Sequence, residues 1–327
     1  MELLPFLVGA ALIFDFLNGF HDSSNIVATV ISSRAMGPRK ALFMAATAHF
    51  VAPFLFGVAV ATTIGKDIIE PSAISGTVVL AAVVAAIVWN IITWLLAIPS
   101  SSSHALIGGL LGSSILAYGF AIVQRPGLIK VLAALLISPI AGLVAGFLIM
   151  RILRFLLRRA TPRVNVYLKR SQIITTLVLS LAHGSNDAQK TMGVITMGLV
   201  ASGLQSSFEI PLWVITVSAS AIALGTMFGG WRLIRTLGGR IYKIRPIHAF
   251  TSQAASAAVI LSAAILGGPV STTQVVGSSI MGAGAAERIS KVRWQVGQEM
   301  LLTWVLTIPA SAIIAAILYI PINLIFR

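Results

Sequence analysis

The chain has 327 residues, 57% of them hydrophobic and only 10% charged, which excludes an ordinary soluble domain and predicts an integral membrane protein. The absence of cysteine excludes disulfides, thiolate metal sites and cysteine nucleophiles. A formal net charge of +14 would suit nucleic acid only if the basic residues formed one face, but they gather in particular loops, so we expect no nucleic-acid partner.

The first apolar segment, 3–33, contains the motif GFHDSSNIVA at Gly19–Ala28. It follows the acidic Glu2 instead of a basic region, so we expect it to stay in the protein and not to be cleaved as a signal peptide. The motif places Asp22 at membrane depth, where a carboxylate is costly and normally serves ions or polar substrates. Asp15 lies on about the same helical face and could belong to a cation path or to a structural network.

Further apolar runs of about 20 residues bring the predicted membrane crossings to ten. They lie at 41–64, 77–98, 104–123, 131–150, 171–202, 211–229, 247–268, 274–283 and 298–320. The segments 3–33 and 171–202 are too long for one straight crossing of a hydrocarbon core about 30 Å thick. We therefore expect both helices to be broken beside a polar motif, at Asn18–Gly19 and at His183–Gly184.

The motif PSSSSH at Pro99–His104 comes between two of these segments. Proline ends one helix, and the hydroxyl run then lies where the next helix begins. Unpaired backbone N–H groups and the positive end of the helix dipole favour an anion at such a place. Whether the motif is a re-entrant tip or a link between full crossings stays open.

The second half of the chain contains both motifs again. GSNDAQKTMG at Gly184–Gly193 matches the first motif at an offset of 165 residues, with Asp187 opposite Asp22. PVSTTQ at Pro269–Gln274 matches the hydroxyl motif at an offset of 170. We therefore divide the chain into a first transmembrane repeat at 1–150, a cytoplasmic basic linker at 151–170 and a second repeat at 171–327. With five crossings each, an odd number, the second repeat must be inverted, a common plan for secondary transporters.

The basic residues support this topology. The connections 34–40, 151–170, 230–246 and 284–297 hold 18 Lys and Arg, whereas 65–72, 124–130, 203–210 and the C-terminal Arg327 hold 4. By the positive-inside rule the first group faces the cytoplasm, which places both termini outside the cell.

The hydroxyl runs together with Lys190 suggest an oxyanion, which Asp22 and Asp187 would repel. Cations bound between carboxylate and anion would relieve this conflict, as would protons on the anion that donate to the carboxylates. Phosphate near pH 7 still carries a proton and sulfate does not, so a carboxylate in the site disfavours sulfate unless a cation or a protonated aspartate intervenes.

GFHDSSNIVATVISSRAM and AHGSNDAQKTMGVI resemble the paired signatures of the inorganic phosphate transporter (PiT) family, and PSSSSHALIGGLLG with GPVSTTQVVGSSI looks like its second conserved pair. The chain is most similar to the compact prokaryotic members. The resemblance implies an all-α polytopic membrane protein with two inverted repeats of about five segments each. It also implies a homodimer that couples uptake of inorganic phosphate across the plasma membrane to a cation.

The resemblance assigns Asp22, Asn25, Asn186 and Asp187 to the phosphate and cation site, where they could bind Na⁺. The full predicted phosphate-binding set is Asp22, Asn25, Ser101, Ser102, Ser103, Asn186, Asp187, Lys190, Ser271, Thr272 and Thr273. Many family members have asparagine at the position of Lys190. Its ammonium group could bind phosphate, take the place of a cation or pair with an aspartate, which leaves the coupling ion open between Na⁺ and H⁺. We expect no other cofactor.

Two further transport functions stay open, a sulfate permease of the same superfamily and an anion channel. An enzyme is not expected, because Ser102 and Ser103 beside His104 do not form a nucleophile and base pair and no G-x-S-x-G motif surrounds them.

Overall fold

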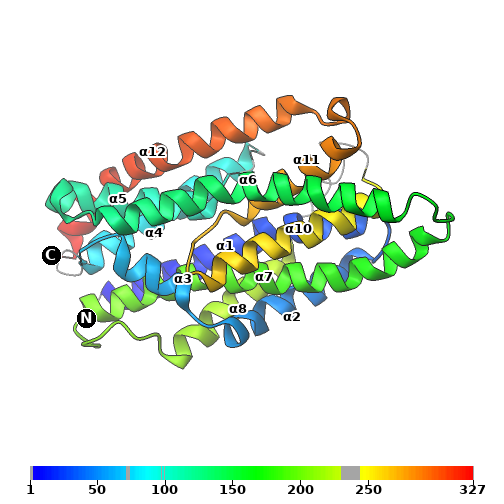
Figure 1. The fold of residues 1–327 in the computed structure, drawn as a ribbon. Coiled ribbons are helices and arrows are strands. Elements are labelled where there is room, and N and C mark those ends of the chain that lie inside the picture. Colours follow the sequence, from blue (N-terminus) through cyan, green and yellow to red (C-terminus); the bar gives the residue numbers. More distant parts are fainter. Residues whose placement is uncertain (1–2, 71–73, 97, 99, 230–243, 327) are drawn as a thin grey trace.

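The computed structural model describes residues 3–70, 74–96, 98, 100–229 and 244–326, which are helical almost throughout (Figure 1). The α-helices are α1 (Leu3–Ser32), α2 (Pro38–Phe56), α3 (Ala59–Thr62), α4 (Gly76–Leu95), α5 (Ser102–Tyr118), α6 (Arg125–Leu156), α7 (Val164–Ala201), α8 (Leu212–Phe228), α10 (Pro246–Ile265), α11 (Thr272–Glu287) and α12 (Trp294–Ile325). The short helices are the π-helix η1 (Thr63–Asp67) and the 3₁₀ helices η3 (Phe120–Ile122) and η4 (Ile289–Lys291). The expected all-α membrane architecture is confirmed for this part of the chain.

Fewer helices qualify as membrane spans than the ten crossings predicted. Within the described ranges five helices are long and apolar enough, namely α1, α4, α6, α10 and most of α12. A sixth is obtained if α2 and the segment Ala59–Asp67, which are bent by 74° relative to each other, count as one broken span. The predicted crossings at 104–123 and 274–283 are instead the shorter helices α5 and α11, and the long α7 carries the polar second motif.

The predicted breaks at Asn18–Gly19 and His183–Gly184 are wrong, because α1 and α7 run through both positions without interruption. The two glycines serve close helix packing. A Cβ atom on Gly19 would lie 2.2 Å from the backbone oxygen of Ile222 in α8, and one on Gly184 would lie 2.7 Å from the Cα atom of His49 in α2. Glycine at these positions therefore lets neighbouring backbones approach and does not end a helix.

The hydroxyl motifs, by contrast, mark helix starts as predicted. Ser101 is the N-cap of α5, and its side chain accepts a hydrogen bond from the backbone N–H of His104. Ser271 is the N-cap of α11 and accepts from the N–H of Gln274 in the same way. Pro99, which was expected to end the preceding helix, lies outside the described residues.

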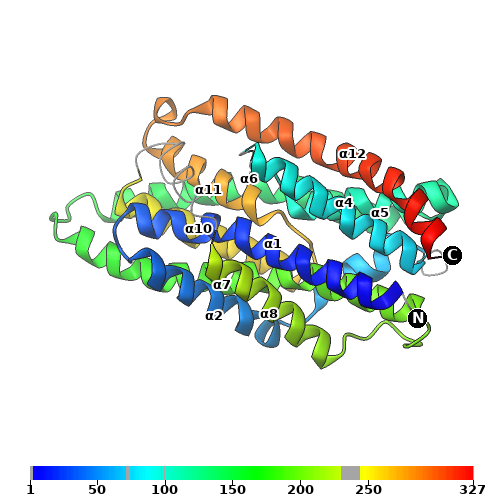
Figure 2. The same ribbon diagram turned by 180° about the vertical axis from the view of Figure 1, so that it is seen from behind.

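The order of the helices forms two hairpins that meet inside the bundle. Helix α4 leads through a short connection into α5, which packs beside it, and α10 leads in the same way into α11. Figures 1 and 2 show the α4–α5 pair toward the end of the molecule that holds both termini and the α10–α11 pair toward the opposite end. The starts of α5 and α11 meet in the interior, where Ser103 of α5 and Val270 before α11 are hydrogen-bonded.

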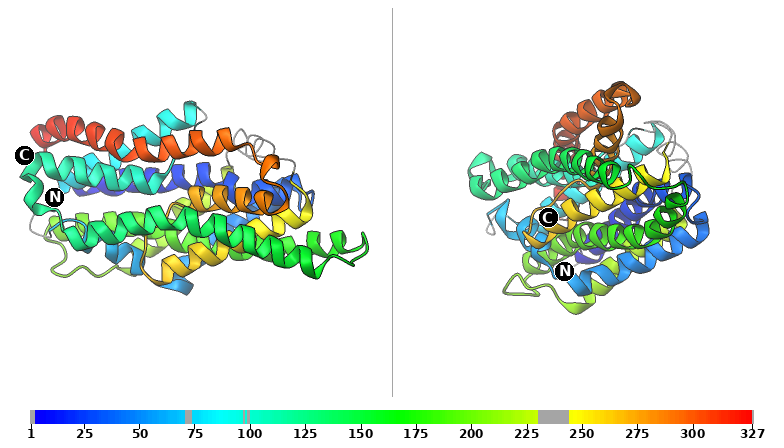
Figure 3. Two further views of the ribbon diagram at one scale, coloured as in Figure 1. Left: turned by 45° about the horizontal axis from the view of Figure 1, so that its top comes forward. Right: turned by 45° about the vertical axis from the view of Figure 1, so that its right-hand side comes forward.

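Helices from the two halves of the chain are interleaved. Helix α1 packs against α8 and α2 packs against α7, while α5 packs against α12 and α11 against α6. Every one of these pairs joins a helix from before residue 157 to a helix from after residue 163. The views in Figure 3 show the resulting bundle from two further directions. The core is therefore made jointly by both halves.

The two ends of the bundle differ in charge. At the end with the termini the rings of Phe6 and Phe326 lie 5.5 Å apart. At the other end Glu287 pairs with Arg245 and with Lys291, and Arg154 donates to the backbone oxygen of Ala286.

The strongly basic connections 34–40, 151–170 and 284–297 lie at this second end, which we call the basic end; residues 230–243 fall outside the described ranges. The predicted linker 151–170 is mostly helical, since only 157–163 separate α6 from α7.

Candidate functional site

Asp22 lies in the middle of the molecule, where the side chains of two other elements surround it. Its Oδ1 atom accepts hydrogen bonds from Asn25 Nδ2 and from Thr273 Oγ1, both at 2.8 Å. The amide of Asn25 also donates to Thr273 at 3.0 Å, so these three groups form a closed triangle. Asp22 is only 6% exposed, and its hydrogen bond from Thr273 joins α1 to the start of α11.

Asp187 enters the same site from α7 and has no exposed surface. Its Oδ2 atom accepts a hydrogen bond of 3.1 Å from Thr272 Oγ1, and the same hydroxyl lies 3.5 Å from Asp22 Oδ2. A hydroxyl has one proton to donate, so Thr272 stands between the two carboxylates and serves one at a time. The aspartates of the two motifs thus face each other across the tip of α11, as the duplicated sequence predicts.

His183 lies between the two carboxylates, and the sequence analysis did not identify it as a site residue. Its Nδ1 atom is 3.1 Å from Asp187 Oδ2 and its Nε2 atom 3.9 Å from Asp22 Oδ2, without hydrogen-bond alignment at either nitrogen. The ring stacks on that of His49 at 5.1 Å between centroids, and His49 Nδ1 contacts Thr226 Oγ1 at 2.8 Å. The spacing of four residues between His183 and Asp187 is the signal that could have revealed this placement.

Lys190 is buried completely and its ammonium group pairs with Asp187 Oδ1. The sequence left open whether Lys190 binds phosphate, replaces a cation or pairs with an aspartate, and the structure shows the pairing with an aspartate. Because the pair neutralises one carboxylate, Lys190 stands where a bound cation would otherwise be needed.

The tips of α5 and α11 meet beside the aspartates. Ser103 Oγ donates to the backbone oxygen of Val270 at 2.8 Å, and Gln274 Nε2 lies 3.4 Å from the imidazole of His104. Ser101 and Ser271 are occupied as helix caps, while Ser102 is buried at the first turn of α5. The two helix starts therefore bring their N–H groups and hydroxyls to one region, although each hydroxyl has a different local task.

Asn186, a predicted site residue, has hydrogen bonds to the connection between α10 and α11 and none to either carboxylate among the described residues. Its amide donates to the backbone oxygen of Gly268 at 3.2 Å, and its Oδ1 atom accepts from the N–H of Val270 at 3.4 Å. Asn186 therefore holds the connection between α10 and α11 in position, because both of its polar atoms are used there.

Two further polar side chains of α1 are buried. Both amide atoms of Asn18 have no hydrogen-bond partner among the described residues, and Asp15 lies beside the hydroxyl of Thr191 in α7. The charges nearest to Asp15 are those of Asp187 and Lys190.

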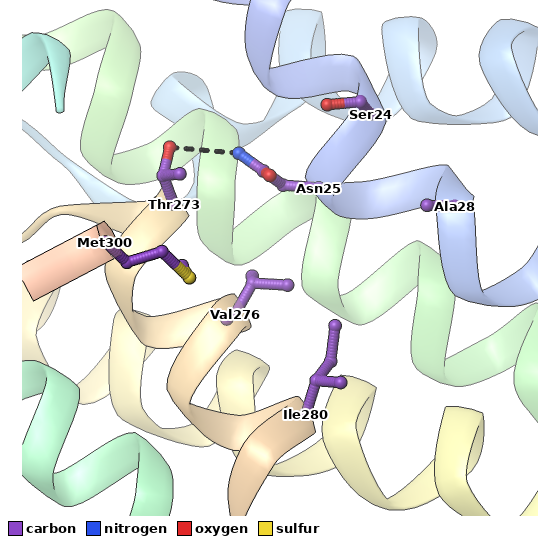
Figure 4. A pocket seen from close by; sticks show the side chains of 8 residues that line it. Ser24, Asn25, Ala28, Thr273, Val276, Ile280 and Met300 are labelled. Carbon is purple, nitrogen blue, oxygen red and sulfur yellow. Dashed lines mark hydrogen bonds between the residues drawn. The ribbon is translucent and has the colours of Figure 1, made fainter. Parts of the chain in front are cut away.

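A small pocket opens from the Asn25–Thr273 pair toward the basic end (Figure 4). It runs between α1, α11 and α12 and is lined by Ser24, Asn25, Ala28, Thr273, Val276, Gly277, Ile280 and Met300. Its wall is mostly apolar, and the side chain of Met300 packs against Gly277, where a Cβ atom would lie 2.5 Å from Met300 Cε. The polar centre thus lies at one end of a small, mostly apolar pocket.

The arrangement can hold a cation. Asp22, His183 and Asp187 each offer a ligand atom, and these atoms lie within 4.8 Å of one another. Two carboxylate oxygens and an imidazole nitrogen suit a metal ion, while protons would bind to the same atoms. The Na⁺ set Asp22, Asn25, Asn186 and Asp187 stays a prediction, and His183 is a further ligand that the structure places beside the two aspartates.

Comparison with known proteins gives a consistent result. Residues 18–315 match the family described as "Phosphate transporter family". A relative from Bacillus subtilis (strain 168), named "Probable low-affinity inorganic phosphate transporter", is 46% identical over 98% of this chain and 97% of its own length. A relative of the same name from Rhizobium meliloti (strain 1021) is 44% identical over 99% of this chain and 97% of its own.

Among solved structures, one described as "The sodium-dependent phosphate transporter" has a TM-score of 0.90 and covers 100% of both chains at 23% sequence identity. At this identity the match establishes a shared fold.

Proposed function

Because this chain belongs to the phosphate transporter family, we propose that it carries inorganic phosphate across the plasma membrane together with a cation, Na⁺ or H⁺. The family and the relatives are transporters and not enzymes. The observation that carries the proposal is the meeting of Asp22 and Asp187 at Thr272, deep inside the bundle. Two carboxylates at this depth are costly unless they bind ions or a substrate that donates protons to them.

Two inverted repeats provide the simplest account of the interleaved helices. The pair α1–α8 corresponds to α7–α2, and α5–α12 corresponds to α11–α6, if the second half is turned over relative to the first. The two hairpins then approach the centre from opposite ends, consistent with Figure 1. Such an arrangement around a central site is typical of secondary transporters.

Phosphate binds, in this proposal, at the starts of α5 and α11. Helix starts present N–H groups and a positive partial charge, and Ser102, Ser103, Thr272 and Thr273 add hydroxyls. A proton of phosphate can donate to Asp22 or Asp187, which favours phosphate over sulfate. The hydrogen bond between Ser103 and Val270 closes the two tips in the present state and has to yield to the anion.

The coupling cation binds among Asp22, His183 and Asp187. Lys190 already neutralises one of the two carboxylates, so one added positive charge is enough to balance this pair before phosphate arrives. The sodium dependence in the name of the structural neighbour supports Na⁺, while the imidazole of His183 and the fixed ammonium of Lys190 suit proton coupling. The two cations are distinguished by the experiment below.

In this proposal phosphate leaves the site toward the basic side by way of the small apolar pocket beside Met300, which has to widen for the anion to pass. Charged loops at that end support a cytoplasmic location by the positive-inside rule, with both termini outside. An apolar constriction of this kind stops ions while it is dry and narrow. The homodimer stays a prediction of the family resemblance.

Uptake into proteoliposomes tests the function. The purified protein should accumulate labelled phosphate against its gradient when a sodium gradient or a pH gradient is imposed, and only the gradient of the coupling ion should be effective. An anion channel would equilibrate phosphate without accumulating it. Equal uptake of labelled sulfate would support the sulfate-permease alternative, and no movement of either anion would refute transport of both.

A further inference from the structure

Gln189 is a buried side chain of the second motif that the proposed site does not use. It lies on α7 two residues after Asp187, toward the end of the bundle that holds both termini, and it is 0% exposed. Its Oε1 atom accepts hydrogen bonds from the backbone N–H groups of Val60 at 2.8 Å and Ala61 at 3.2 Å. Its Nε2 atom donates to the backbone oxygen of Ser185 in its own helix. The amide of Gln189 therefore connects α7 to α3.

The two N–H groups belong to the first turn of α3, which has no capping side chain of its own. Helix α3 begins after the bend of 74° that separates it from α2. The first N–H groups of a helix have no partner within the helix, and leaving them buried and unpaired is costly. Gln189 therefore supplies from another helix the cap that α3 lacks.

The segment Ala59–Asp67, which consists of α3 and η1 and is called the bent segment below, packs against the connection between α10 and α11. A Cβ atom on Gly267 of that connection would lie 3.2 Å from Thr63 Oγ1. Thr63 also accepts a hydrogen bond of 3.1 Å from Lys130 in α6. The connection leads into the start of α11, whose hydroxyls bind both central aspartates. The bent segment therefore lies against the hairpin tip that forms the polar centre.

The repeated motif allows the two sides of the polar centre to be compared. Ser24 of the first motif corresponds to Gln189 of the second, 165 residues later, and both Ser24 and Ala28 line the pocket that opens toward the basic end (Figure 4). The counterpart of Ala28 is Gly193. A Cβ atom on Gly193 would lie 2.8 Å from the backbone oxygen of Ala61 in α3. The same two motif positions thus face a pocket on one side of the aspartates and are covered by α3 on the other.

We propose that the bent segment is the gate on the side of the termini and that Gln189 holds it shut in this structure. The inference rests on the proposed function, since it describes how phosphate enters the same site. Gly57 between α2 and α3 is the hinge, because its φ of 76° favours glycine and a Cβ atom there would meet no atom of the described residues within 4 Å. When the bent segment turns away from α7, water hydrates the two N–H groups that Gln189 releases, and phosphate reaches the starts of α5 and α11.

The far end of the bent segment has other contacts. Ile69 forms a β-bridge with Val123, which joins the chain after the bent segment to the chain before α6. Lys130 Nζ lies 3.7 Å from Asp67 Oδ2, but both side chains are partly exposed, and such a pair contributes little to stability. The buried hydrogen bonds of Gln189 are therefore the contact to remove in a test.

The first measurement is the rate at which the buried side of the bent segment becomes accessible. Thr63→Cys places a thiol at a side chain that is 2% exposed, in a chain that has no cysteine. In intact cells, where the proposed topology places the termini outside, an impermeant thiol reagent should label it slowly. The additional change Gln189→Leu removes the acceptor and leaves two N–H groups unpaired only while the gate is shut. Labelling should then be at least about fivefold faster.

The second measurement is the half-saturating phosphate concentration on each side of the membrane. Gln189→Leu should lower it several-fold for phosphate added on the side of the termini, because apparent affinity rises with the fraction of protein that is open to that side. The value measured from the basic side should not fall. A matched control is Gln205→Leu, which makes the same substitution where Gln205 donates to the backbone oxygen of Glu209 between α7 and α8. It should leave the labelling rate and both concentrations at their wild-type values.

A second control separates a gate from general loosening of the protein. Ser180 is buried in α7 on the other side of Asp187, so Ser180→Cys should stay unlabelled with or without Gln189→Leu. Faster labelling of Ser180→Cys as well as Thr63→Cys would show loosening of the whole bundle and overturn the inference.

Wild-type labelling of Thr63→Cys in the Gln189→Leu background would also overturn the inference, while phosphate transport stays intact. If Gln189→Leu does not reach the membrane, Gln189→Asn decides, because its amide is one methylene shorter and loses the same two hydrogen bonds. Faster labelling would again support the gate, and an unchanged rate would refute it. A wild-type protein that does not move phosphate would instead refute the proposed function.

Discussion

The hydroxyl of Thr273 donates a 2.8 Å hydrogen bond to the carboxylate of Asp22, although 251 residues separate them in the chain. The bond joins the first motif of one half to the second motif of the other. The polar centre is therefore formed by elements that neither half could assemble alone.

Replacing either central aspartate should stop coupled transport. Asp22→Asn and Asp187→Asn keep the size of the side chain but remove the charge that binds the cation, so phosphate uptake driven by a cation gradient should fall to background. The amount of protein in the membrane, measured by immunoblot, should stay close to wild type for Asp22→Asn and fall for Asp187→Asn, which leaves the buried Lys190 without its partner, so uptake is expressed per amount of protein. Uptake at the wild-type rate in either variant would remove that aspartate from the site, and Asp67→Asn is the control for a peripheral carboxylate.

Replacing Lys190 should create a need for a cation. In Lys190→Asn the buried Asp187 loses its partner, a change that costs about 3–5 kcal/mol when nothing compensates. Sodium should therefore raise the melting temperature of this variant more than that of the wild type, and its uptake should depend more steeply on sodium. A variant with weaker phosphate affinity and unchanged sodium dependence would show instead that Lys190 binds the anion.

Sulfate should compete poorly with phosphate. It has no proton at neutral pH to donate to Asp22 or Asp187, and an unmade hydrogen bond to a charged group costs about 1.5–3 kcal/mol. The inhibition constant of sulfate against labelled phosphate should therefore exceed the half-saturating phosphate concentration by at least about tenfold. Similar values for the two anions would support a sulfate permease.

The orientation can be measured with single cysteines, since the wild-type chain has none. Ala160→Cys lies in the exposed connection between α6 and α7, and Ser206→Cys lies in the exposed connection between α7 and α8 at the opposite end. An impermeant thiol reagent added to intact cells should label Ser206→Cys and spare Ala160→Cys. The reverse pattern would invert the topology and leave the inverted repeat unaffected.

Acid should loosen the basic end through Glu287. Partial burial raises the pKa of Glu287, but hydrogen bonds from Arg245, Lys291 and His248 outweigh this effect and hold the pKa well below its usual value of 4.5. A lowered pKa means that the stabilisation is complete above about pH 4.5 and is lost as the pH falls toward the pKa of the folded state.

The melting temperature of the detergent-solubilised wild type should therefore fall more between about pH 5 and pH 3 than that of Glu287→Gln. Because other carboxylates titrate in the same range, the difference between the two proteins is the quantity to compare. Parallel curves would show that the ion pairs of Glu287 contribute nothing to stability.

The sequence predicts the starts of α5 and α11 well because their signal is local. A hydroxyl side chain that caps its own helix needs no distant partner, and Ser101 and Ser271 do so in the same way. The prediction for Gly19 and Gly184 failed for the opposite reason. Glycine permits both a break and a close approach of two backbones, and only the positions of Ile222 and His49 decide between them.

The sequence predicted which aspartates belong to the polar centre, but not which residues contact them. The repeated motif identifies Asp22 and Asp187, yet the role of His183 depends on its location between two helices of different halves. The amide of Asn186 could bind an ion, but in the structure it donates a hydrogen bond to the backbone oxygen of Gly268. When a side chain can bind either an ion or a neighbouring loop, its role can be assigned only after the position of that loop is known.

Helix α7 contains 38 residues and α6 contains 32, lengths of about 57 and 48 Å. Even at a tilt of about 40°, the upper range for membrane helices, α7 would project over roughly 44 Å, well beyond a hydrocarbon layer of about 30 Å. The joined ends of the two helices, which extend farthest at the basic end in Figure 1, therefore project beyond the hydrocarbon layer into water. A soluble domain fused into 157–163 would stand clear of the membrane, which makes this connection a suitable attachment point for a marker in electron microscopy.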